Sequence, residues 1–225
     1  MKQFNYDLLE NRKKELIQDN RKTGRVYHSP DGTFPSITNL LFEMVSKKGI
    51  QEWEEKIGKE AAQKIKTKAS RRGTRVHGYL EKAPPDHMEL VKLAIPQIDE
   101  KIDNIRGIEL GMWSEGLKVA GTSDLIADYE GELAVIDWKT ATYIKKEEYI
   151  LSYILQGTAY CRMLYELYGL LPKKVVICTL IRFDGMKYNP FMDEDLYIDW
   201  KVFNPLDYIR QLKSVCDAFH FKRGS

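Results

Sequence analysis

The spacing of hydrophobic positions changes twice along the chain. Up to about residue 105, apolar side chains recur every three or four positions, the period of amphipathic helices. We therefore expect helices at residues 6–19, 40–47, 50–68, from Arg71 to just before Pro84, and 88–105. Between the first two, the stretch SPDGTFPS at residues 29–36 is typical of a turn-rich loop. Its last residue, Ser36, is placed to cap a helix that begins at Ile37.

From residue 108 to residue 139 the period becomes that of β-strands. The runs GTSDLIADY and ELAVIDWK are joined by Glu130-Gly131, which predicts a tight hairpin turn. Helical spacing returns over residues 147–168 and stops at Gly169. KKVVICTLIRF then predicts a buried strand and YIDWKVF a further one, and Pro205 starts a C-terminal helix.

This order of elements favours an α/β fold with a mixed central sheet flanked by helices. A chain of 225 residues is long enough for one sizeable core. We expect one domain over residues 1–225, in which 1–105 form a mainly helical N-terminal elaboration and 106–225 a sheet-containing core.

Overall charge says little about partners, because the formal net charge is only +2. The distribution of charge says more. Between Ala62 and His77 the sequence contains no acid but six basic residues, Lys64, Lys66, Lys68, Arg71, Arg72 and Arg75. Such a stripe can bind phosphates even on a nearly neutral protein, although a run of charge can also be an ordinary solvated helix face.

The expected environment is intracellular. Three cysteines lie far apart without CxxC spacing, which argues against a zinc site or an iron–sulfur cluster and suits a reducing compartment. The N-terminal residues lack a secretory signal, and no stretch approaches the roughly 20 apolar residues of a membrane span. We expect a cytoplasmic protein, in the host cytoplasm if its origin is viral.

Asp124, Asp137 and Lys139 are the strongest candidates for chemistry. Alternate residues of a strand share a face, so Asp137 and Lys139 project together while Trp138 points away. The hairpin can bring Asp124 beside Asp137, and two adjacent carboxylates repel unless a cation lies between them. Hard oxygen ligands with open positions suit Mg²⁺ or Mn²⁺. Lys139 can then orient a water molecule or stabilise charge on a phosphate.

A surface hairpin with one salt bridge is the simpler interpretation of the same three residues. Asp137, however, directly follows the apolar run Leu133-Ala134-Val135-Ile136. A charge that abruptly ends a buried strand is more often part of a site than a surface decoration.

The stretch GTSDLIADYEGELAVIDWKTA resembles motifs II and III of the PD-(D/E)XK nucleases, especially the RecB-like exonuclease branch. Ser123 stands where that motif usually has proline. The resemblance implies a restriction-endonuclease-like core that hydrolyses phosphodiesters with Mg²⁺ or Mn²⁺. It also implies that Asp124 and Asp137 bind the metal, with the carbonyl oxygen of Trp138 as a further ligand.

Two helical motifs resemble the same branch. Gly73-Thr74-Arg75-Val76-His77 is similar to its GxxxH element, which implies that His77 is a metal ligand rather than a structural histidine. Gln156-Gly157-Thr158-Ala159-Tyr160 is similar to its QxxxY motif. There the glutamine helps to position the lysine or the scissile phosphate, while Tyr160 could equally be a core residue. Glu115 lies where this branch often has an acid and is a further candidate.

Upstream, the stretch Phe34-Pro35-Ser36-Ile37-Thr38 and the basic helix that follows resemble viral exonucleases and those of mitochondrial genome maintenance. This resemblance implies helices that arch over the active site. Ser36 and Thr38 would contact the DNA backbone, unless they merely form a helix cap. Four residues of the stripe would line its path: Lys68, Arg71, Arg72 and Arg75.

The function expected from this resemblance is metal-dependent exonuclease activity on single-stranded DNA, in replication, repair or recombination. One alternative is a flap- or junction-cutting endonuclease on the same core. Another is a non-catalytic DNA-binding module, although such a module has no need to keep His77, Asp124, Asp137 and Lys139 together.

Overall fold

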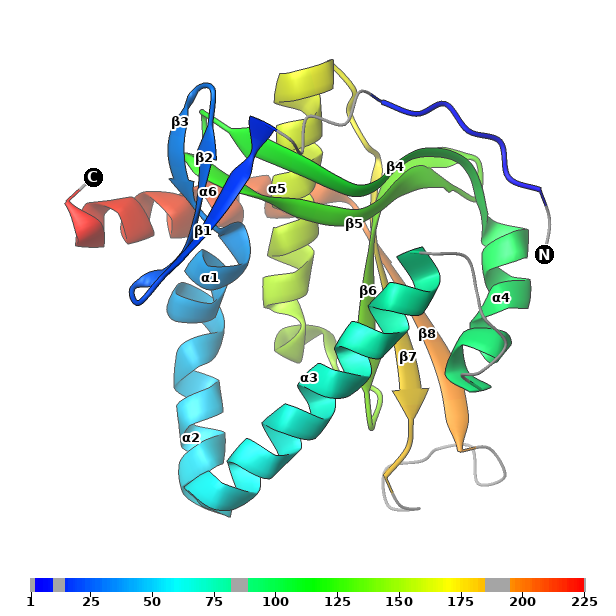
Figure 1. Ribbon diagram of the computed structural model, residues 1–225, viewed down its shortest axis with the longest axis horizontal. Helices are drawn as coiled ribbons and strands as arrows, with labels where there is room; N and C mark the ends of the chain where they lie inside the picture. The colour runs from blue at the N-terminus through cyan, green and yellow to red at the C-terminus, as the bar shows by residue number, and fades with distance from the viewer. Residues whose placement is uncertain (1–2, 10–14, 82–88, 185–194, 225) are drawn as a thin grey trace.

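The computed structural model describes residues 3–9, 15–81, 89–184 and 195–224 (Figure 1). Its centre is a five-stranded sheet in the order β4-β5-β6-β7-β8. The strands are β4 (Ile102–Ser114), β5 (Val119–Tyr129), β6 (Glu132–Ala141), β7 (Lys174–Arg182) and β8 (Leu196–Phe203). Only β6 and β7 run parallel; the other neighbouring pairs are antiparallel. The predicted α/β fold with a mixed sheet is therefore confirmed.

The hairpin between β5 and β6 forms where the sequence predicts it. Tyr129 pairs with Glu132, so Glu130 and Gly131 are the two turn residues. Both have positive φ, 50° and 78°, as a two-residue hairpin turn with the right-handed twist of the strands requires. The turn sets the register that brings Asp124 toward Asp137.

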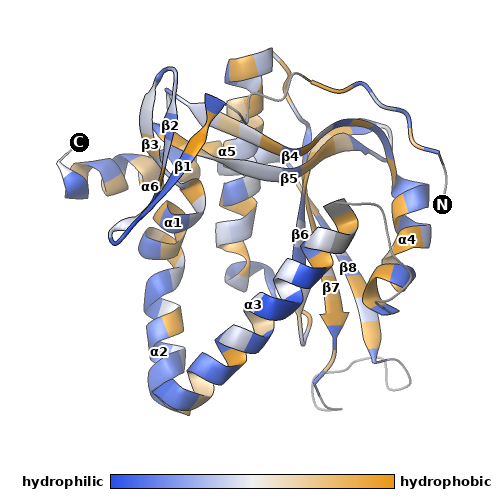
Figure 2. Ribbon diagram, in the orientation of Figure 1, coloured by the Kyte–Doolittle hydropathy of each residue, from blue (hydrophilic) through white to orange (hydrophobic). Residues whose placement is uncertain are grey.

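Helices cover both faces of the sheet. On one face α5 (Leu151–Tyr168) and α6 (Pro205–Arg223) pack with α1 (Ile37–Leu41) against side chains such as Val135 and Ile177. On the other face, α3 (Lys59–Glu81) and α4 (Glu89–Lys101) contribute to a second cluster that includes Ala134 and Ile136. Alternate β6 residues thus enter opposite cores, and Figure 2 shows the apolar strands between these helices.

The helical N-terminal part forms an angled pair beside the sheet. After α1 the chain continues as the π-helix η2 (Phe42–Ser46) and then as α2 (Lys47–Ile57). Gly58, with φ of 87°, ends α2, and α3 returns at an angle toward β6 (Figure 1). The predicted helix over residues 50–68 is therefore wrong as one piece: it breaks at Gly58, and its second half continues without interruption to Glu81.

The helix predicted at residues 6–19 does not form in the described part of that range. Asn5 and Asp7 instead exchange backbone hydrogen bonds with Ile105. A three-stranded sheet then follows, made of β1 (Ile17–Arg21), β2 (Gly24–Ser29) and β3 (Gly32–Pro35). The expected loop at 29–36 is therefore a short turn followed by a strand.

Tertiary contacts explain this difference. Leu16, Tyr27 and Phe34 are buried together against Trp113. The indole Nε1 of Trp113 also donates to Oδ2 of Asp31 at 2.6 Å. Local spacing of apolar residues does not reveal a partner that lies some 80 residues away.

Two helix ends also differ from expectation. Ser36 is the N-cap residue of α1, but its hydroxyl makes no capping hydrogen bond. The helix predicted over residues 88–105 ends at Lys101, and Ile102 already belongs to β4.

Among the helices that the structure describes, none combines the length and apolar character needed to cross a bilayer.

Candidate active site

The candidate site lies at a fork in the sheet. Pairing between β5 and β6 starts at the hairpin turn and ends with the pair Leu125 and Ile136. Beyond them β5 continues beside β4, while β6 continues beside β7. Asp124 and Asp137 are the first residues past the separation. The backbone N–H of Trp138 donates to Oδ2 of Asp124 at 2.9 Å, so a side chain replaces the missing strand partner.

Asp137 and Lys139 project to the same side of β6, as alternation along a strand requires. Asp137 is only 2% exposed, and its Oδ2 forms an ion pair with Nζ of Lys139. Trp138 points into the opposite core, where its ring packs edge-on against Trp200 with centroids 6.0 Å apart. Strand β6 thus packs Trp138 into the core on one side and presents the charged groups of Asp137 and Lys139 on the other.

The two carboxylates and the ammonium strongly affect one another. Burial and the neighbouring charge of Asp137 together raise the pKa of Asp124 to about 7, although Lys139 and His77 oppose the shift. Burial by itself would lower the pKa of Lys139, but attraction to Asp137 and Asp124 outweighs it and raises that pKa above its ordinary value. The site therefore holds excess negative potential, which favours a cation.

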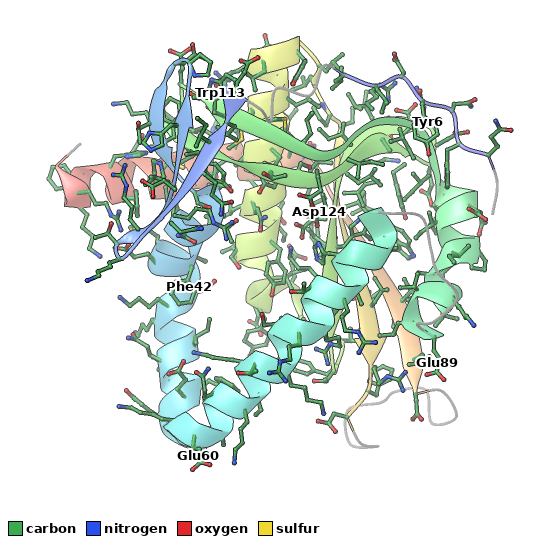
Figure 3. All side chains as sticks on the ribbon, in the orientation of Figure 1. Tyr6, Phe42, Glu60, Glu89, Trp113 and Asp124 are labelled. Carbon is green, nitrogen blue, oxygen red and sulfur yellow. The ribbon has the colours of Figure 1, made fainter. Side chains whose placement is uncertain are left out.

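A group of three possible metal ligands surrounds Asp124. Ligand atoms of His77, Glu109 and Asp124 all lie within 4.8 Å of one another, and Nδ1 of His77 is 3.6 Å from Oδ2 of Asp124. One imidazole and two carboxylates suit a divalent cation such as Mn²⁺ or Mg²⁺. The donor set therefore fits the metal that the sequence predicts. Figure 3 shows Asp124 close to the C-terminal half of α3, the helix that carries His77.

Glu109 is the member of this group that the sequence analysis missed. It lies in β4 with φ of 50°, a conformation that residues other than glycine rarely adopt inside a strand. Strained backbone of this kind concentrates at functional sites. The available signal was a single acid within an otherwise apolar run, Gly107-Ile108-Glu109-Leu110-Gly111.

Glu115 does not share this position. It is exposed and lies in the turn between β4 and β5, beyond the paired residues Ser114 and Val119. Asp124 is five strand residues from Val119, or roughly 17 Å along β5. Glu115 therefore lies apart from the group around Asp124, to which Glu109 belongs.

Helix α5 packs against both β5 and β7 and carries Gln156 and Tyr160. Nε2 of Gln156 donates to the Tyr160 hydroxyl at 3.2 Å, and Tyr160 is buried, which raises the pKa of its phenol. Two glycines permit this close packing. A Cβ on Gly157 would lie 2.3 Å from Val175, and one on Gly121 would lie 2.9 Å from the Tyr160 hydroxyl. Tyr160 is thus a core residue that orients Gln156.

The basic residues of α3 line a cleft of about 950 Å³ that α3 forms with α4 and the end of β7. Its lining includes all four residues predicted to follow DNA, namely Lys68, Arg71, Arg72 and Arg75. Two other members of the stripe are neutralised, since Lys64 pairs with Glu60 and Lys66 with Glu54. The expectation that the stripe lacks balancing acids is therefore wrong at these two positions. We refer below to this space as the basic cleft.

Ser36 and Thr38 have different surroundings. Ser36 is 1% exposed, and its hydroxyl finds no hydrogen-bond partner among the described residues. It is therefore inside the protein, not on a surface that a strand could touch. Thr38 is exposed and borders a second cleft, next to α5.

Known proteins resemble part of this chain. The human mitochondrial genome maintenance exonuclease 1 is 26% identical over 125 residues, which covers 48% of this chain and 36% of the human protein. The mouse protein of the same name is 25% identical over 126 residues, with 48% and 37% covered. The chain thus spans little more than a third of the length of these curated relatives.

A solved structure, described as the crystal structure of SSO0001, superposes with a TM-score of 0.40 and 16% identity, over 83% of this chain and 74% of that chain. The sequence profile of the PD-(D/E)XK nuclease superfamily matches residues 40–205. That range contains the fork of the sheet with Asp124, Asp137 and Lys139, together with His77 and Gln156. The chain therefore belongs to the PD-(D/E)XK nuclease superfamily.

Proposed function

We propose that this nuclease is a divalent-metal-dependent exonuclease that hydrolyses phosphodiester bonds at the ends of single-stranded DNA. The observation that carries the proposal is the fork of the sheet, where Asp124, Asp137 and Lys139 come together and His77 of α3 reaches Asp124. The names of the curated relatives describe them as exonucleases of mitochondrial genome maintenance, which supports DNA as the substrate.

His77, Glu109 and Asp124 would hold the cation, with Asp137 and the carbonyl oxygen of Trp138 beside them. When bound, Mg²⁺ or Mn²⁺ supplies Lewis-acid polarisation of a phosphate oxygen. Among the protein's own side chains, Lys139 places a positive charge beside the carboxylates of Asp124 and Asp137. Asp137 holds that ammonium in place, so that it can orient an attacking water or stabilise charge on the phosphate.

Gln156 has a supporting role in this arrangement. Its amide is oriented by the buried Tyr160 and lies on the wall of the second cleft, on the side of Lys139. The fold of α5 over the fork therefore sets the position of Gln156 relative to Lys139. Such positioning matters because misplacing a reacting group by about 1 Å can cost a hundredfold in rate.

The covering of the site by α3 supports action on a single strand from an end. At Gly73, a Cβ would lie 4.0 Å from Oγ1 of Thr140, so α3 crosses directly over the end of β6. Arginine and lysine side chains of the same helix line the basic cleft, where they offer contacts to phosphates. A flexible single strand can pass beneath a helix more easily than a stiff duplex can.

The test compares three labelled substrates, which are linear single-stranded, linear double-stranded and circular single-stranded DNA. Each is incubated with Mg²⁺, with Mn²⁺ or with EDTA, beside an Asp137→Ala variant. We expect metal-dependent loss of linear single strands only, with circles intact and the variant inactive. Lys139→Ala should also abolish cleavage while it leaves DNA binding largely intact.

Other outcomes select the alternatives. Cutting of the circles would replace the proposal with a structure-specific endonuclease. Absence of cleavage in either metal, by folded protein that still binds DNA, would favour a non-catalytic binding module. The roles in replication, repair or recombination depend on the first outcome.

A further inference from the structure

A second cleft, of about 780 Å³, lies between the η2–α2 segment and the N-terminal part of α5. Five aromatic residues border it, Phe42, Trp53, Tyr143, Tyr149 and Tyr153. Phe42, labelled in Figure 3, lies at the start of η2. We call this space the aromatic cleft. It shares no lining residue with the basic cleft.

Three of these rings are well exposed to solvent. The exposed fractions are 47% for Phe42, 43% for Tyr143 and 65% for Tyr149. Apolar surface gathered around one concave site, rather than scattered, is typical of a binding surface. The wall that carries Phe42 is also a π-helix, an uncommon irregularity that occurs frequently at functional sites.

Charge distinguishes the two clefts. Glu52, Glu148 and Lys145 are the charged residues that line the aromatic cleft among the described residues. A phosphate chain would meet more negative than positive charge there, so this cleft cannot track a backbone as the basic cleft can. Aromatic rings instead offer flat faces for nucleobases, with little preference for sequence.

The aromatic cleft is continuous with the catalytic residues. Nζ of Lys139 lies 5.0 Å from the centroid of the Tyr153 ring. Nζ of Lys145 donates to the hydroxyl of that same tyrosine at 3.1 Å. Gln156 is also part of the wall. A nucleotide whose phosphate reached Lys139 would therefore have its neighbouring base at the entrance of this cleft.

We propose that the aromatic cleft stacks unpaired bases of the strand whose phosphates are held by the basic cleft. This inference rests on the proposed function and deepens it, because it assigns single-strand selectivity to particular side chains. Bases in a duplex are already stacked on their neighbours, so they cannot enter. Binding then has two parts, a salt-dependent one on α3 and a largely salt-independent one beside α5.

The test measures binding in EDTA, so that no cleavage occurs. The two probes are labelled oligonucleotides of equal length and equal phosphate charge, one with bases and one with an abasic tract in the middle. We expect the wild-type chain to bind the base-bearing strand at least tenfold more tightly than the strand with the abasic tract. The Phe42→Ala/Tyr149→Ala double variant should lose most of that preference.

Matched variants separate stacking from other effects. Tyr165 is 47% exposed on α5 and borders neither described cleft, so Tyr165→Ala should keep the full preference. Arg71→Gln/Arg75→Gln should weaken binding of both probes by similar factors and leave their ratio unchanged. If the double aromatic variant folds poorly, Tyr149→Ala alone is the substitute, since its exposed ring makes few packing contacts.

Equal affinity of the wild-type protein for the two probes would overturn the inference, and so would a double variant that keeps the full preference. Either result would leave the proposed function standing, provided that linear strands are still cleaved with metal. Conversely, a base preference without any cleavage would retain the aromatic cleft and reject the exonuclease.

Discussion

The surroundings of Asp124 oppose its ordinary negative charge. It lies at the fork, largely buried, with Asp137 alongside and a backbone N–H of Trp138 as donor. In the metal-free protein the folded carboxyl keeps its proton up to about pH 7, whereas the unfolded one loses it near pH 4. The folded state therefore binds more protons than the unfolded state within this window.

That difference predicts how stability depends on pH. Without metal, the free energy of unfolding should fall as pH rises from about 4 to about 7. Asp124→Asn should remove this loss, so that the variant is more stable at pH 8 by up to about 4 kcal/mol and equal to wild type below pH 4. Urea unfolding in EDTA across this range measures it. Asp217→Asn, on the exposed face of α6, is the control, and parallel curves for Asp124→Asn and wild type would refute the argument.

Glu109 and Glu115 form a matched pair of acids for testing the proposed metal ligands His77, Glu109 and Asp124. A carboxylate oxygen of Glu109 lies within 4.8 Å of possible ligand atoms of His77 and Asp124, whereas Glu115 is exposed in a turn. We expect Glu109→Gln to raise the Mg²⁺ concentration that half-saturates cleavage by at least tenfold, since it removes a charged ligand. Glu115→Gln should leave that concentration unchanged. A titration in which both variants match wild type would remove Glu109 from the site.

At the scale of elements, the contact between α5 and β7 decides the position of Gln156. This contact exists because Gly157 has no side chain, and a Cβ there would lie 2.3 Å from Val175. Overpacking of this kind typically costs about 1–3 kcal/mol. The same shift would move the helix that carries Gln156 away from the fork.

We therefore expect Gly157→Ala to lower the free energy of unfolding by about 1–3 kcal/mol and to reduce cleavage. Gly49→Ala is the matched control for stability, because a Cβ on Gly49, in the first turn of α2, meets nothing within 4 Å. That variant should gain roughly 0.5–1 kcal/mol from better helix propensity. Thermal or urea unfolding checks both, and a stable, fully active Gly157→Ala would show that the close approach is unimportant.

At the scale of the whole molecule, the proposed binding of DNA should depend on salt through the basic cleft. Lys68, Arg71 and Arg75 line the basic cleft and form no ion pair with other described residues. Arg182 on the opposite wall is paired with Glu89 at 2.5 Å. The unpaired cations on α3 are thus the ones free to replace counterions on a strand.

Arg71→Gln/Arg75→Gln should reduce the slope of log affinity against log salt concentration by about 1.4, since each single-strand phosphate contact contributes about 0.7. Lys48→Gln/Lys213→Gln removes the same charge outside both clefts and should leave the slope nearly unchanged. Fluorescence anisotropy at several salt concentrations measures the two slopes. A double arginine variant with the wild-type slope would identify the α3 charges as a solvated helix face.

The sequence by itself determined the parts of this protein that depend on local order. Alternation along β6 put Asp137 and Lys139 on one side and Trp138 on the other. The turn residues Glu130-Gly131 set the register of the hairpin, because few residue pairs accept positive φ at both positions. The α/β order and the helix that ends at Gly169 followed from the same kind of signal.

Only the tertiary structure decided what depends on distant contacts. The first three strands form because Tyr27 and Phe34 pack on Trp113. The break at Gly58 divides one predicted helix into two helices, α2 and α3, that meet at an angle. Glu109 has a positive φ in β4 and lies with His77 and Asp124 in the group of possible metal ligands, and no spacing rule relates it to His77 on α3. Separation of the basic and aromatic clefts likewise arises from how α2, α3 and α5 are placed in space. Periodicity describes which way a side chain faces on its own element, whereas the neighbour it meets depends on how the elements pack together.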